Sequence, residues 1–506
     1  GRFQVFRSYS IVIGLMCISS LLLASACQSK QLTVLYAAEL PLINNPPHGS
    51  YANLASLVKQ TRDTQQPSLF LFGGGSLAPS MLSSFDRGAH IIDILNTIEP
   101  DAMGIAKREI SYFEDELTLR AYEAAFPLVL SNVTDPLTGR ELEETWQDII
   151  VERGGVRVGI LTVIASASSE EYLMQRLQIN APYDTIVSRS SALRERGAEL
   201  IVLMVSDELP FINKLLSQSQ VDLVLRNDPY YVKPLAVDEK PRANYVVVTK
   251  EATAAIVNIE WPQGNPAEAQ FTVEQLPLSN YPKDPVIAEQ VAIYDNRITA
   301  LLSEQVARLT TEMDTTRDAV RTRENGFGNL VSDALKEASH TDVAIINGGA
   351  IRGERSYREG HLLTRKDITS ELPFRNHIRV LRITGADLKS ALENGVSRIE
   401  AASGRFPHVS GMQFKVQLSA APGNRVKDLT INGGPMEADR IYSLATSDYL
   451  ANGGDGYESL KRGSEVPFSQ QVTPLIADIV ISILRRQSEL AATAQGRVTF
   501  ISGRGN

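Results

Sequence analysis

The first half of the chain alternates short apolar runs with longer amphipathic stretches. The apolar runs are bounded by turn residues, which is the pattern of buried strands. These runs are Leu32–Tyr36, Leu69–Phe72, Ala102–Ile105, Leu128–Ser131, Val156–Ile164, Leu200–Val205, Asp222–Leu225 and Tyr245–Val248. Helical periodicity lies between them, at Asn53–Thr61, Ala89–Thr97 and Ser188–Arg196. Alternation of strands and helices predicts a layered α/β domain in which helices cover the sheet.

A second α/β unit is predicted in the rest of the chain. The polar, amphipathic stretch Asp284–Thr299 predicts a connecting helix. Beyond it we expect a helix at Asn329–Ala338, a strand at Val343–Ile346 and a helix at Thr384–Glu400. The predicted organisation is an N-terminal segment at 1–27, a first domain at 28–280, a linker helix at 281–304 and a second domain at 305–506.

The N-terminal segment has the pattern of an export signal. Arg2 and Arg7 precede the apolar run Ile11–Leu23, and small residues come just before Cys27. The apolar run is shorter than the about 20 residues that a membrane-spanning helix needs. Residues 23–27 resemble the lipobox of bacterial lipoproteins, which implies cleavage before Cys27 and lipid attachment to it; the alternative is ordinary signal-peptide cleavage beside a chance cysteine. We expect a lipoprotein of the cell envelope, in the periplasm, at the outer membrane or at the cell surface.

Cysteine content and net charge narrow the class of protein. The two cysteines are Cys17 and Cys27, so cleavage before Cys27 leaves the mature chain without a disulfide. The formal net charge is −9 at pH 7. Because nucleic-acid binding depends on a basic face that displaces counterions from phosphates, no nucleic-acid partner is expected. The expected contacts are a small molecule and, through the lipid, a membrane; protein partners stay unknown.

Two glycine-rich turns in the second domain combine polar groups with room for close backbone approach. Asn347-Gly348-Gly349-Ala350-Ile351-Arg352 directly follows an apolar strand, and Asn452-Gly453-Gly454-Asp455-Gly456-Tyr457 is the second turn. Glycine lacks a Cβ, so a ligand can come near the main chain. An arginine can hold a phosphate or carboxylate in bidentate fashion, and an aspartate suits sugar hydroxyls. Taken singly, such a turn is more often an ordinary loop than a binding site.

Five blocks in this domain together resemble the C-terminal domain of the 5′-nucleotidase family, in family order. The blocks are Arg323-Glu324 with Gly328-Asn329-Leu330 and Asp333-Ala334, Asn347–Arg352, Leu372-Pro373-Phe374-Arg375-Asn376, Gly404-Arg405-Phe406-Pro407 with Val409-Ser410-Gly411, and Thr446–Tyr457. The resemblance implies an α/β fold in two parts. These are an N-terminal, metallophosphatase-like four-layer α/β sandwich and a C-terminal α/β 5′-nucleotidase domain, joined by a helix.

The resemblance also implies a nucleoside-binding site. It assigns the aromatic rings that clamp the base to Phe374 and Tyr449, and the ribose-binding acid to Asp455. The remaining substrate-binding contacts fall on Arg323, Asn347, Gly349 and Arg352. The alternative for the two rings is ordinary core packing. Arg375 departs from the family pattern, which usually has glycine there, and its long side chain would narrow the pocket.

The first domain resembles the family's metallophosphatase domain, but its metal-binding motifs are replaced. The family holds two metal ions with Asp, His and Asn side chains at strand ends, and such ions clamp the attacking and leaving oxygens of phosphate-ester hydrolysis. Asp-x-His becomes Glu39-Leu40-Pro41, Gly-Gly-Asp becomes Gly73-Gly74-Gly75, and Gly-Asn-His-Glu becomes Ala106-Lys107-Arg108-Glu109. Ser111 stands where the family has the acid that partners the catalytic histidine, and Ser206 stands where it has a further histidine. The family's closing Gly-His-x-His motif is replaced by Arg226-Asn227-Asp228-Pro229-Tyr230.

The number of possible metal-binding side chains in the first domain also indicates that a two-metal site is missing. Of the six histidines, only His48 and His90 lie in the first domain. Glu39 and Asp228 remain as plausible oxygen donors, which is a poor set for a transition metal. We therefore expect no metal cofactor and no catalytic residue. Because removal of metals would leave acids unpaired, Lys107 and Arg108 are expected to pair with Glu39, Glu109 or Asp228; the alternative is that both face solvent.

Three functions remain open at this stage. The first is a nucleoside or nucleotide binder without metal-dependent hydrolysis. The second is an active 5′-nucleotidase or other phosphoesterase of nucleotide catabolism that uses an unrecognised site. The third is an interaction or scaffold lipoprotein of the envelope. Whether the chain is an enzyme is left undecided, because fold-level resemblance does not fix activity.

Overall fold

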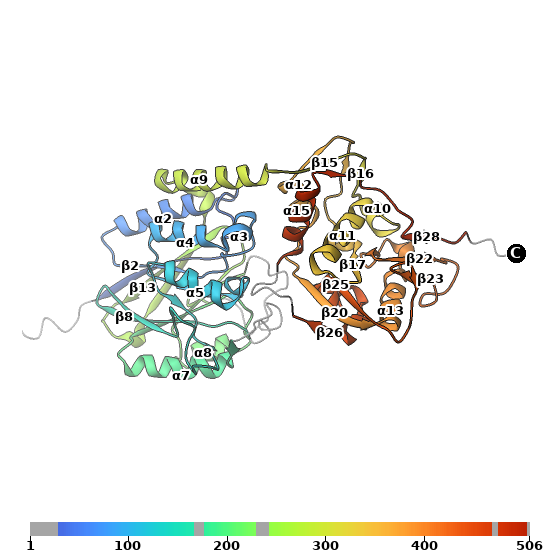
Figure 1. The fold of residues 1–506 in the computed structure, drawn as a ribbon. Helices are drawn as coiled ribbons and strands as arrows, with labels where there is room; N and C mark the ends of the chain where they lie inside the picture. Colours follow the sequence, from blue (N-terminus) through green and yellow to red (C-terminus); the bar gives the residue numbers. More distant parts are fainter. Residues whose placement is uncertain (1–28, 166–176, 229–241, 468–473, 503–506) are drawn as a thin grey trace, which may run out of the picture. The chain divides into compact units, whose positions relative to one another are not determined.

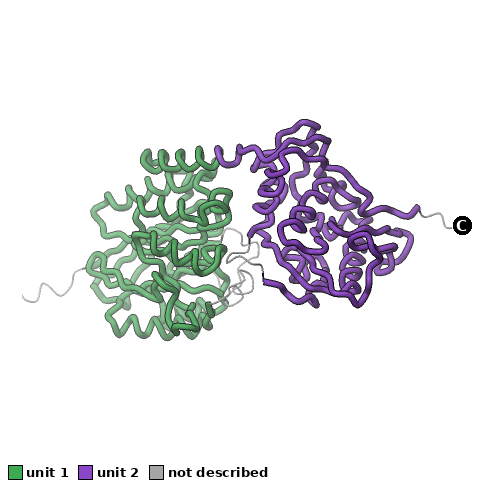
Figure 2. Tube along the Cα trace, viewed as in Figure 1, with its two compact units in different colours: residues 1–298 green, residues 299–506 purple. Residues whose placement is uncertain are grey.

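The computed structural model describes residues 29–165, 177–228, 242–467 and 474–502. The chain forms two compact units that divide between Ile298 and Thr299 (Figure 2). Each unit contains hydrophobic cores of its own. Cys27, Pro229 and Tyr230 lie outside the described residues. Among the described residues, no helix has both the length and the apolar character to cross a membrane.

Two sheets face each other in unit 1. The seven-stranded sheet has the order β14-β13-β1-β2-β3-β4-β6 and the five-stranded sheet has the order β12-β11-β10-β8-β7. The strands of the first are β14 (Gln270–Pro277), β13 (Thr253–Trp261), β1 (Lys30–Ala37), β2 (Ser68–Phe72), β3 (Ala102–Gly104), β4 (Leu128–Val129) and β6 (Thr145–Trp146). Those of the second are β12 (Tyr245–Val248), β11 (Leu223–Asn227), β10 (Leu200–Val205), β8 (Val156–Thr162) and β7 (Ile149–Arg153).

Helices cover the outer faces of both sheets, which gives the four layers that the family resemblance implies (Figure 1). Apolar side chains such as Leu69, Ile160 and Met204 pack between the two sheets. The outer face of the first sheet packs against α2 (Tyr51–Asp63), α4 (Ala89–Ile98) and α5 (Phe113–Glu123). The outer face of the second packs against α7 (Pro182–Glu195) and α8 (Ile212–Ser217).

Burial on both faces explains why apolar runs predicted the strands of this unit. All six residues of β10, Leu-Ile-Val-Leu-Met-Val, are buried, as expected for a central parallel strand covered on both sides. Every predicted run of the first domain overlaps a strand. Strands β6, β7, β13 and β14 of the two sheets were not predicted. Along the edge strand β14, exposed polar residues alternate with half-buried ones and leave no apolar run.

The predicted connecting helix is α9 (Pro285–Leu302). It begins with proline at a position that needs no N–H, and the Asp284 side chain accepts a hydrogen bond from the Ile287 N–H at 3.1 Å. Ile287 and Val291 are buried in unit 1, and the Tyr294 hydroxyl donates to Asp93 at 2.5 Å. The first part of α9 is therefore a packed element of unit 1.

Unit 2 is built on a five-stranded sheet with the order β21-β17-β25-β20-β26. Its strands are β21 (Pro407–Ser410), β17 (Val343–Asn347), β25 (Ile441–Ser447), β20 (Ile378–Thr384) and β26 (Ser464–Val466). One face packs against α11 (Gly326–Ser339), α12 (Arg365–Glu371) and α15 (Ile476–Gln487). The other packs against α13 (Gly385–Gly395) and a sheet of β24 (Gly434–Pro435), β23 (Val426–Ile431), β22 (Met412–Val416) and β28 (Val498–Phe500).

The predicted helix at Thr384–Glu400 is too long. Helix α13 ends at Gly395, and a short 3₁₀ turn follows at Ile399–Ala401. A Cβ at Gly395 would lie 2.6 Å from the Tyr457 hydroxyl and 2.8 Å from Pro407. The close approach of these two residues therefore requires glycine at the position where the helix ends.

Candidate functional site

Loops after five strands of unit 1 meet at one edge of the sandwich. Strands β1, β2 and β3 run parallel, as do β10 and β11, so each set has its carboxyl ends at one edge. The Asn227 side chain of β11 donates to the Ala38 carbonyl after β1 at 3.3 Å, which brings the two edges together. Seven charged residues gather there, named below the strand-edge cluster: Glu39, Glu109, Asp207, Asp228, Lys107, Arg108 and Arg226.

The carboxyl group of Glu39 fills the space beside Gly75. A Cβ at Gly75 would lie 2.2 Å from Glu39 Oε1, and Gly75 has a φ of +68°. Arg108 Nη1 lies 3.3 Å from Glu39 Oε2, and the two side chains are 19% and 8% exposed. The predicted pairing of Arg108 with Glu39 is therefore confirmed, and a solvent-facing Arg108 is wrong.

Glu109 is the most deeply held acid of the strand-edge cluster. Its carboxyl group accepts hydrogen bonds from the backbone N–H groups of Gly75 at 2.5 Å, Ser76 at 3.1 Å and Ala106 at 3.2 Å. A Cβ at Gly74 would lie 2.0 Å from Glu109 Oε1. The glycines that replace the family's Gly-Gly-Asp motif therefore leave room for two glutamates.

Burial favours the neutral form of both glutamates. It raises the pKa of Glu39 to about 8, an effect that Arg108 opposes and that the charges of Glu109 and Asp228 reinforce. It also raises the pKa of Glu109 to about 7, against the effect of the hydrogen bonds from Ala106, Gly75 and Ser76. Because a metal ligand must be deprotonated, a metal ion bound here would have to displace these protons.

Bases accompany the other acids of the cluster. Lys107 Nζ lies 4.0 Å from Asp207 Oδ1, and Asp207 also accepts the Ala165 N–H at 2.7 Å. Asp207 was not among the partners expected for Lys107. Arg226, whose side chain is fully buried, lies 3.4 Å from Asp228 Oδ2.

These residues do not fit the two metal ions that the family resemblance implies. In the described part of the chain, no group of three or more His, Cys, Asp or Glu side chains is arranged to hold a metal ion. His90 is buried on α4 and lies 2.9 Å from Asp86, while His48 lies 3.8 Å from Glu251. The strand-edge cluster places ammonium and guanidinium groups beside its acids, and these groups repel a cation.

Unit 2 brings most of the predicted binding residues together after strands β17 and β25 and helix α12. The Asn347 side chain donates to Asp455 Oδ2 at 2.8 Å, and the Tyr449 hydroxyl donates to Asp455 Oδ1 at 2.7 Å. The Arg352 guanidinium lies 5.1 Å from the centre of the Phe374 ring, within the range of a cation–π contact. We call these five residues the arginine–aromatic cluster. Their role in binding stays a prediction.

Neither aromatic ring of this cluster belongs to the core. Phe374 is 48% exposed and Tyr449 is 43% exposed, so core packing is wrong for both. Asp455 has a φ of +53°, which is unusual for a residue other than glycine. A Cβ at Gly454 would lie 2.5 Å from the Tyr449 ring. The second glycine-rich turn therefore sets both the ring and the carboxylate in place.

Two predicted residues play different parts from those expected. The Gly349 N–H donates to the Gly404 carbonyl at 2.8 Å, so it joins two loops and is already used as a donor. Arg323 Nη1 lies 2.7 Å from Asp318 Oδ2, and the Arg323 side chain is 53% exposed. The Arg323 guanidinium therefore takes no part in the contacts that join Asn347, Tyr449 and Asp455 or Arg352 and Phe374.

Arg317 and Arg321 were missed by the sequence argument. Burial lowers the pKa of Arg321, and the nearby charges of Arg317 and Arg352 lower it further, while Asp455 acts in the opposite direction. Arg317 and Arg321 begin and end the short helix α10 (Arg317–Arg321), and a spacing of four residues places them on one face. That spacing was the available signal. Like charges held together in this way suit an anionic ligand.

Sequence comparison identifies known proteins that are similar to this chain. Residues 305–462 match the family described as 5′-nucleotidase, C-terminal domain. Human 5′-nucleotidase is 23% identical over 502 residues, covering 90% of this chain and 86% of the human protein. The snake venom 5′-nucleotidase of Macrovipera lebetinus is 30% identical over 241 residues, 44% of this chain, and the match spans 58% of that enzyme's length.

The fold is shared with a solved structure of similar length. The crystal structure of the 5′-nucleotidase precursor from Thermus thermophilus superposes with a TM-score of 0.54 at 22% identity. The superposition covers 94% of this chain and all of that one. Residues 305–462 therefore form a 5′-nucleotidase C-terminal domain, and the chain is similar to 5′-nucleotidases in sequence over most of its length and in its two-unit fold.

Proposed function

We propose that this protein binds a nucleotide through the arginine–aromatic cluster of unit 2 and does not hydrolyse it by a two-metal mechanism. The relatives named above are 5′-nucleotidases. Two exposed rings beside a hydrogen-bonded carboxylate offer stacking for a base and acceptors for ribose hydroxyls. Stacking of a base on an aromatic side chain tolerates different bases, so the proposal names a nucleotide without naming its base.

The arginines favour a nucleotide over a nucleoside as the ligand. Arg317, Arg321 and Arg352 lie close enough together that their charges lower the pKa of Arg321. Guanidinium groups bind phosphate oxygens in bidentate fashion. A phosphate placed near Arg321 would relieve the repulsion among the three cations, and a neutral nucleoside would not.

One observation carries the absence of two-metal hydrolysis. The Glu39 carboxyl group occupies the space into which a side chain at position 75 would project, and Arg108 lies 3.3 Å from it. The family's metal-binding aspartate falls on this position, so its place is filled by a glutamate already paired with a base. A Lewis acid would have to displace Arg108 and deprotonate Glu39 before it could bind.

Calorimetric titration tests the binding half of the proposal. We expect AMP to bind the purified full chain more tightly than adenosine, and Phe374→Ala to weaken both. Arg321→Gln should weaken AMP and leave adenosine unchanged. Arg308→Gln is the matched control, because Arg308 is an exposed arginine of unit 2 that pairs with Glu489. Equal binding of AMP by wild type and Arg321→Gln rejects the phosphate contact, and no binding of either ligand favours the scaffold function.

Phosphate release tests the second half. AMP with added Mn²⁺ or Zn²⁺ should yield no phosphate above a blank, and purified protein should retain no Mn, Zn, Fe or Co by elemental analysis. Turnover that disappears in Glu39→Ala would overturn the proposal in favour of an active phosphoesterase. Turnover that survives in the Glu39→Ala, Asp228→Ala double variant points to a contaminating enzyme.

We also propose that the protein is exported and lipid-anchored at Cys27. The support is the basic, apolar and small-residue order of positions 2–27. Intact-mass measurement after expression in a bacterial host should find a diacylated N-terminal cysteine. In Cys27→Ala the mass of the lipid should be absent, and the protein should no longer be found in the membrane fraction. An unmodified Cys27 in the wild type would reject lipid anchoring and leave only the proposal of export.

A further inference from the structure

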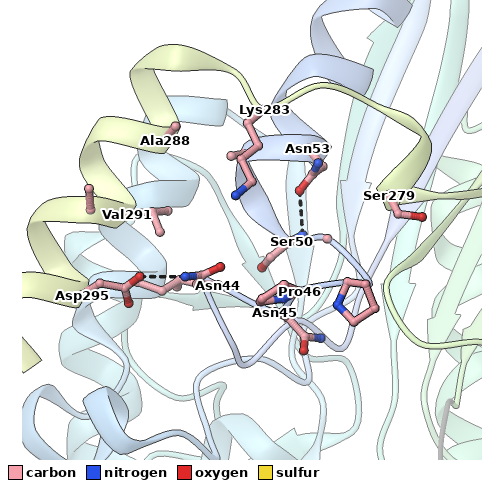
Figure 3. Close-up of a pocket in the computed structure, with 15 residues that line it drawn as sticks. Asn44, Asn45, Pro46, Ser50, Asn53, Ser279, Lys283, Ala288, Val291 and Asp295 are labelled. Atoms are coloured by element: carbon pink, nitrogen blue, oxygen red, sulfur yellow. Dashed lines mark hydrogen bonds between the residues drawn. The ribbon is translucent and has the colours of Figure 1, made fainter. Parts of the chain in front are cut away.

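A cavity lies in unit 1, between α9 and the loop that leads into α2 (Figure 3). It has a volume of about 300 Å³, the lower end of the range for small-molecule sites. Ala288, Val291 and Ala292 of α9 form one wall, and the short side chains of the two alanines leave the space open. The residues of the strand-edge cluster and of the arginine–aromatic cluster do not line it.

The walls of this cavity are fixed by hydrogen bonds. The Ser50 N–H donates to Asn53 Oδ1 at 3.0 Å, and Asn53 Nδ2 donates to the Tyr281 carbonyl at 2.8 Å. The Asp284 N–H donates to the Ala52 carbonyl at 2.9 Å. The start of α2 is thus joined to the segment that leads into α9. A cavity with walls held in this way is preformed, which lowers the cost of binding a ligand.

Opposite charges lie at two places on the cavity wall. Figure 3 shows the Lys283 side chain directed toward the hollow, and among the described residues Lys283 makes no hydrogen bond and no ion pair. Asp295 lies farther along α9, where its carboxylate accepts a hydrogen bond from Asn44 Nδ2 at 3.1 Å. Pro285 and Asp295 are ten residues apart on the helix, so about 15 Å of helix axis separates them.

From this arrangement we propose that the cavity binds a small zwitterion with separated charges, such as an ω-amino acid or a short peptide. Its carboxylate would contact Lys283 and its ammonium group would contact Asp295. Asn44, already bonded to Asp295, would hold that carboxylate in place. The methylene chain between the charges would lie against Ala288, Val291 and Ala292. This site is separate from the proposed nucleotide site and does not depend on it.

Calorimetry with ω-amino acids of increasing length tests the proposal on the full chain. We expect ε-aminocaproate to bind and γ-aminobutyrate to bind more weakly, because its charges are closer together. Caproate and hexylamine, which carry one charge each, should bind at least about tenfold more weakly, since each loses one charge-assisted contact. Equal affinity for caproate and ε-aminocaproate would make this an anion site and overturn the zwitterion assignment.

Variants locate the binding to this cavity. Lys283→Met and Asp295→Asn should each weaken ε-aminocaproate about tenfold or more, and Ala292→Leu should abolish binding by filling the space. Lys59→Met is the matched control, because Lys59 is an exposed lysine of α2 that does not line the cavity. Circular dichroism of each variant shows whether it folds. Folded variants that bind ε-aminocaproate as wild type does, or a wild type that binds neither ω-amino acid, would reject the proposal.

Discussion

Both units gather charged side chains after the strands of a sheet, but the two clusters differ in how their charges are satisfied. In the strand-edge cluster each base lies beside an acid, as Arg108 does beside Glu39 and Lys107 beside Asp207. In the arginine–aromatic cluster two rings are exposed, and Arg317 and Arg321 lie near its Arg352. The first arrangement leaves a ligand little to gain. The second leaves charge and apolar surface that a nucleotide would satisfy.

The largest expected effect is on the pH dependence of unit 1. The folded-state pKa values of Glu39 and Glu109, about 8 and 7, exceed the ordinary value of 4.5. The folded chain therefore binds these protons more tightly than the unfolded chain does. The stabilisation is complete below the unfolded pKa and is lost as the pH rises toward the folded pKa values. The free energy of unfolding should fall by roughly 2 to 3 kcal/mol per pH unit between about pH 5 and 7, since each of the two protons contributes about 1.4 kcal/mol per pH unit.

Tryptophan fluorescence during urea unfolding measures this effect in unit 1 alone. The chain has two tryptophans, Trp146 and Trp261, and both lie in unit 1. Glu39→Gln should flatten the pH slope by about half, because one of the two titrating groups is removed. Glu143→Gln, at an exposed glutamate of the same unit, is the control. An unchanged slope in Glu39→Gln would show that Glu39 is not one of the titrating groups.

Removal of the base from the strand-edge cluster should have the next largest effect. Arg108→Ala leaves Glu39 without its guanidinium neighbour, which should cost about 3 kcal/mol at pH 9, where Glu39 is ionised. At pH 6 the carboxyl group is protonated and the cost should be much smaller. The same urea titration checks both values. A cost that is equal at both pH values would mean that Arg108 acts through packing and not through its charge.

The strand pattern was predictable because burial imposes it locally. Runs such as Leu200–Val205 are apolar throughout, since helices and the opposite sheet cover both faces. The pairing of Arg108 with Glu39 was also predictable. The family's metal-binding residues are replaced in this chain, so the remaining acids were expected to need basic side chains as partners. The fit of Glu39 against Gly75 was not predictable, since it depends on the positive φ values of both residues.

Contacts that depend on tertiary placement were out of reach of sequence reasoning. The approach of Lys107 to Asp207 joins a loop of one sheet to a loop of the other. The approach of Arg321 to Arg352 likewise joins α10 to the turn after β17. The spacing of Arg317 and Arg321 shows a common helix face, but it does not show what that face meets.

A smaller effect separates stacking from hydrogen bonding in the arginine–aromatic cluster. Tyr449→Ala removes the ring and should weaken nucleotide binding by about 1–3 kcal/mol. Tyr449→Phe keeps the ring and loses only the hydroxyl that donates to Asp455, so about 0.5–1.5 kcal/mol is expected. AMP titration of both variants measures the difference. The unfolding of unit 1 should not change in either, and equal losses would assign the whole effect to the hydroxyl.

The smallest effect concerns Glu371, which supports the contact between Arg352 and Phe374. Its side chain is fully buried and accepts hydrogen bonds from the Thr315 hydroxyl at 2.7 Å and the Tyr357 hydroxyl at 3.3 Å. Its own backbone carbonyl accepts the Arg352 N–H at 2.8 Å. Glu371 ends α12 three residues before Phe374, so it fixes the main chain on both sides of the cation–π contact.

Glu371→Gln tests this positioning role. The amide keeps the size of the side chain, and its oxygen can replace Oε2, which accepts both hydroxyls. Its NH₂ group then faces the Gly353 N–H and cannot accept the hydrogen bond that the carboxylate accepts from it. We expect AMP to bind about two- to fivefold more weakly, which corresponds to one weakened hydrogen bond. Adenosine should bind almost unchanged, because the loss acts through Arg352. Glu359→Gln, at an exposed glutamate of the same unit, is the control. Equal losses for AMP and adenosine would mean that Glu371 stabilises the fold generally and does not position Arg352.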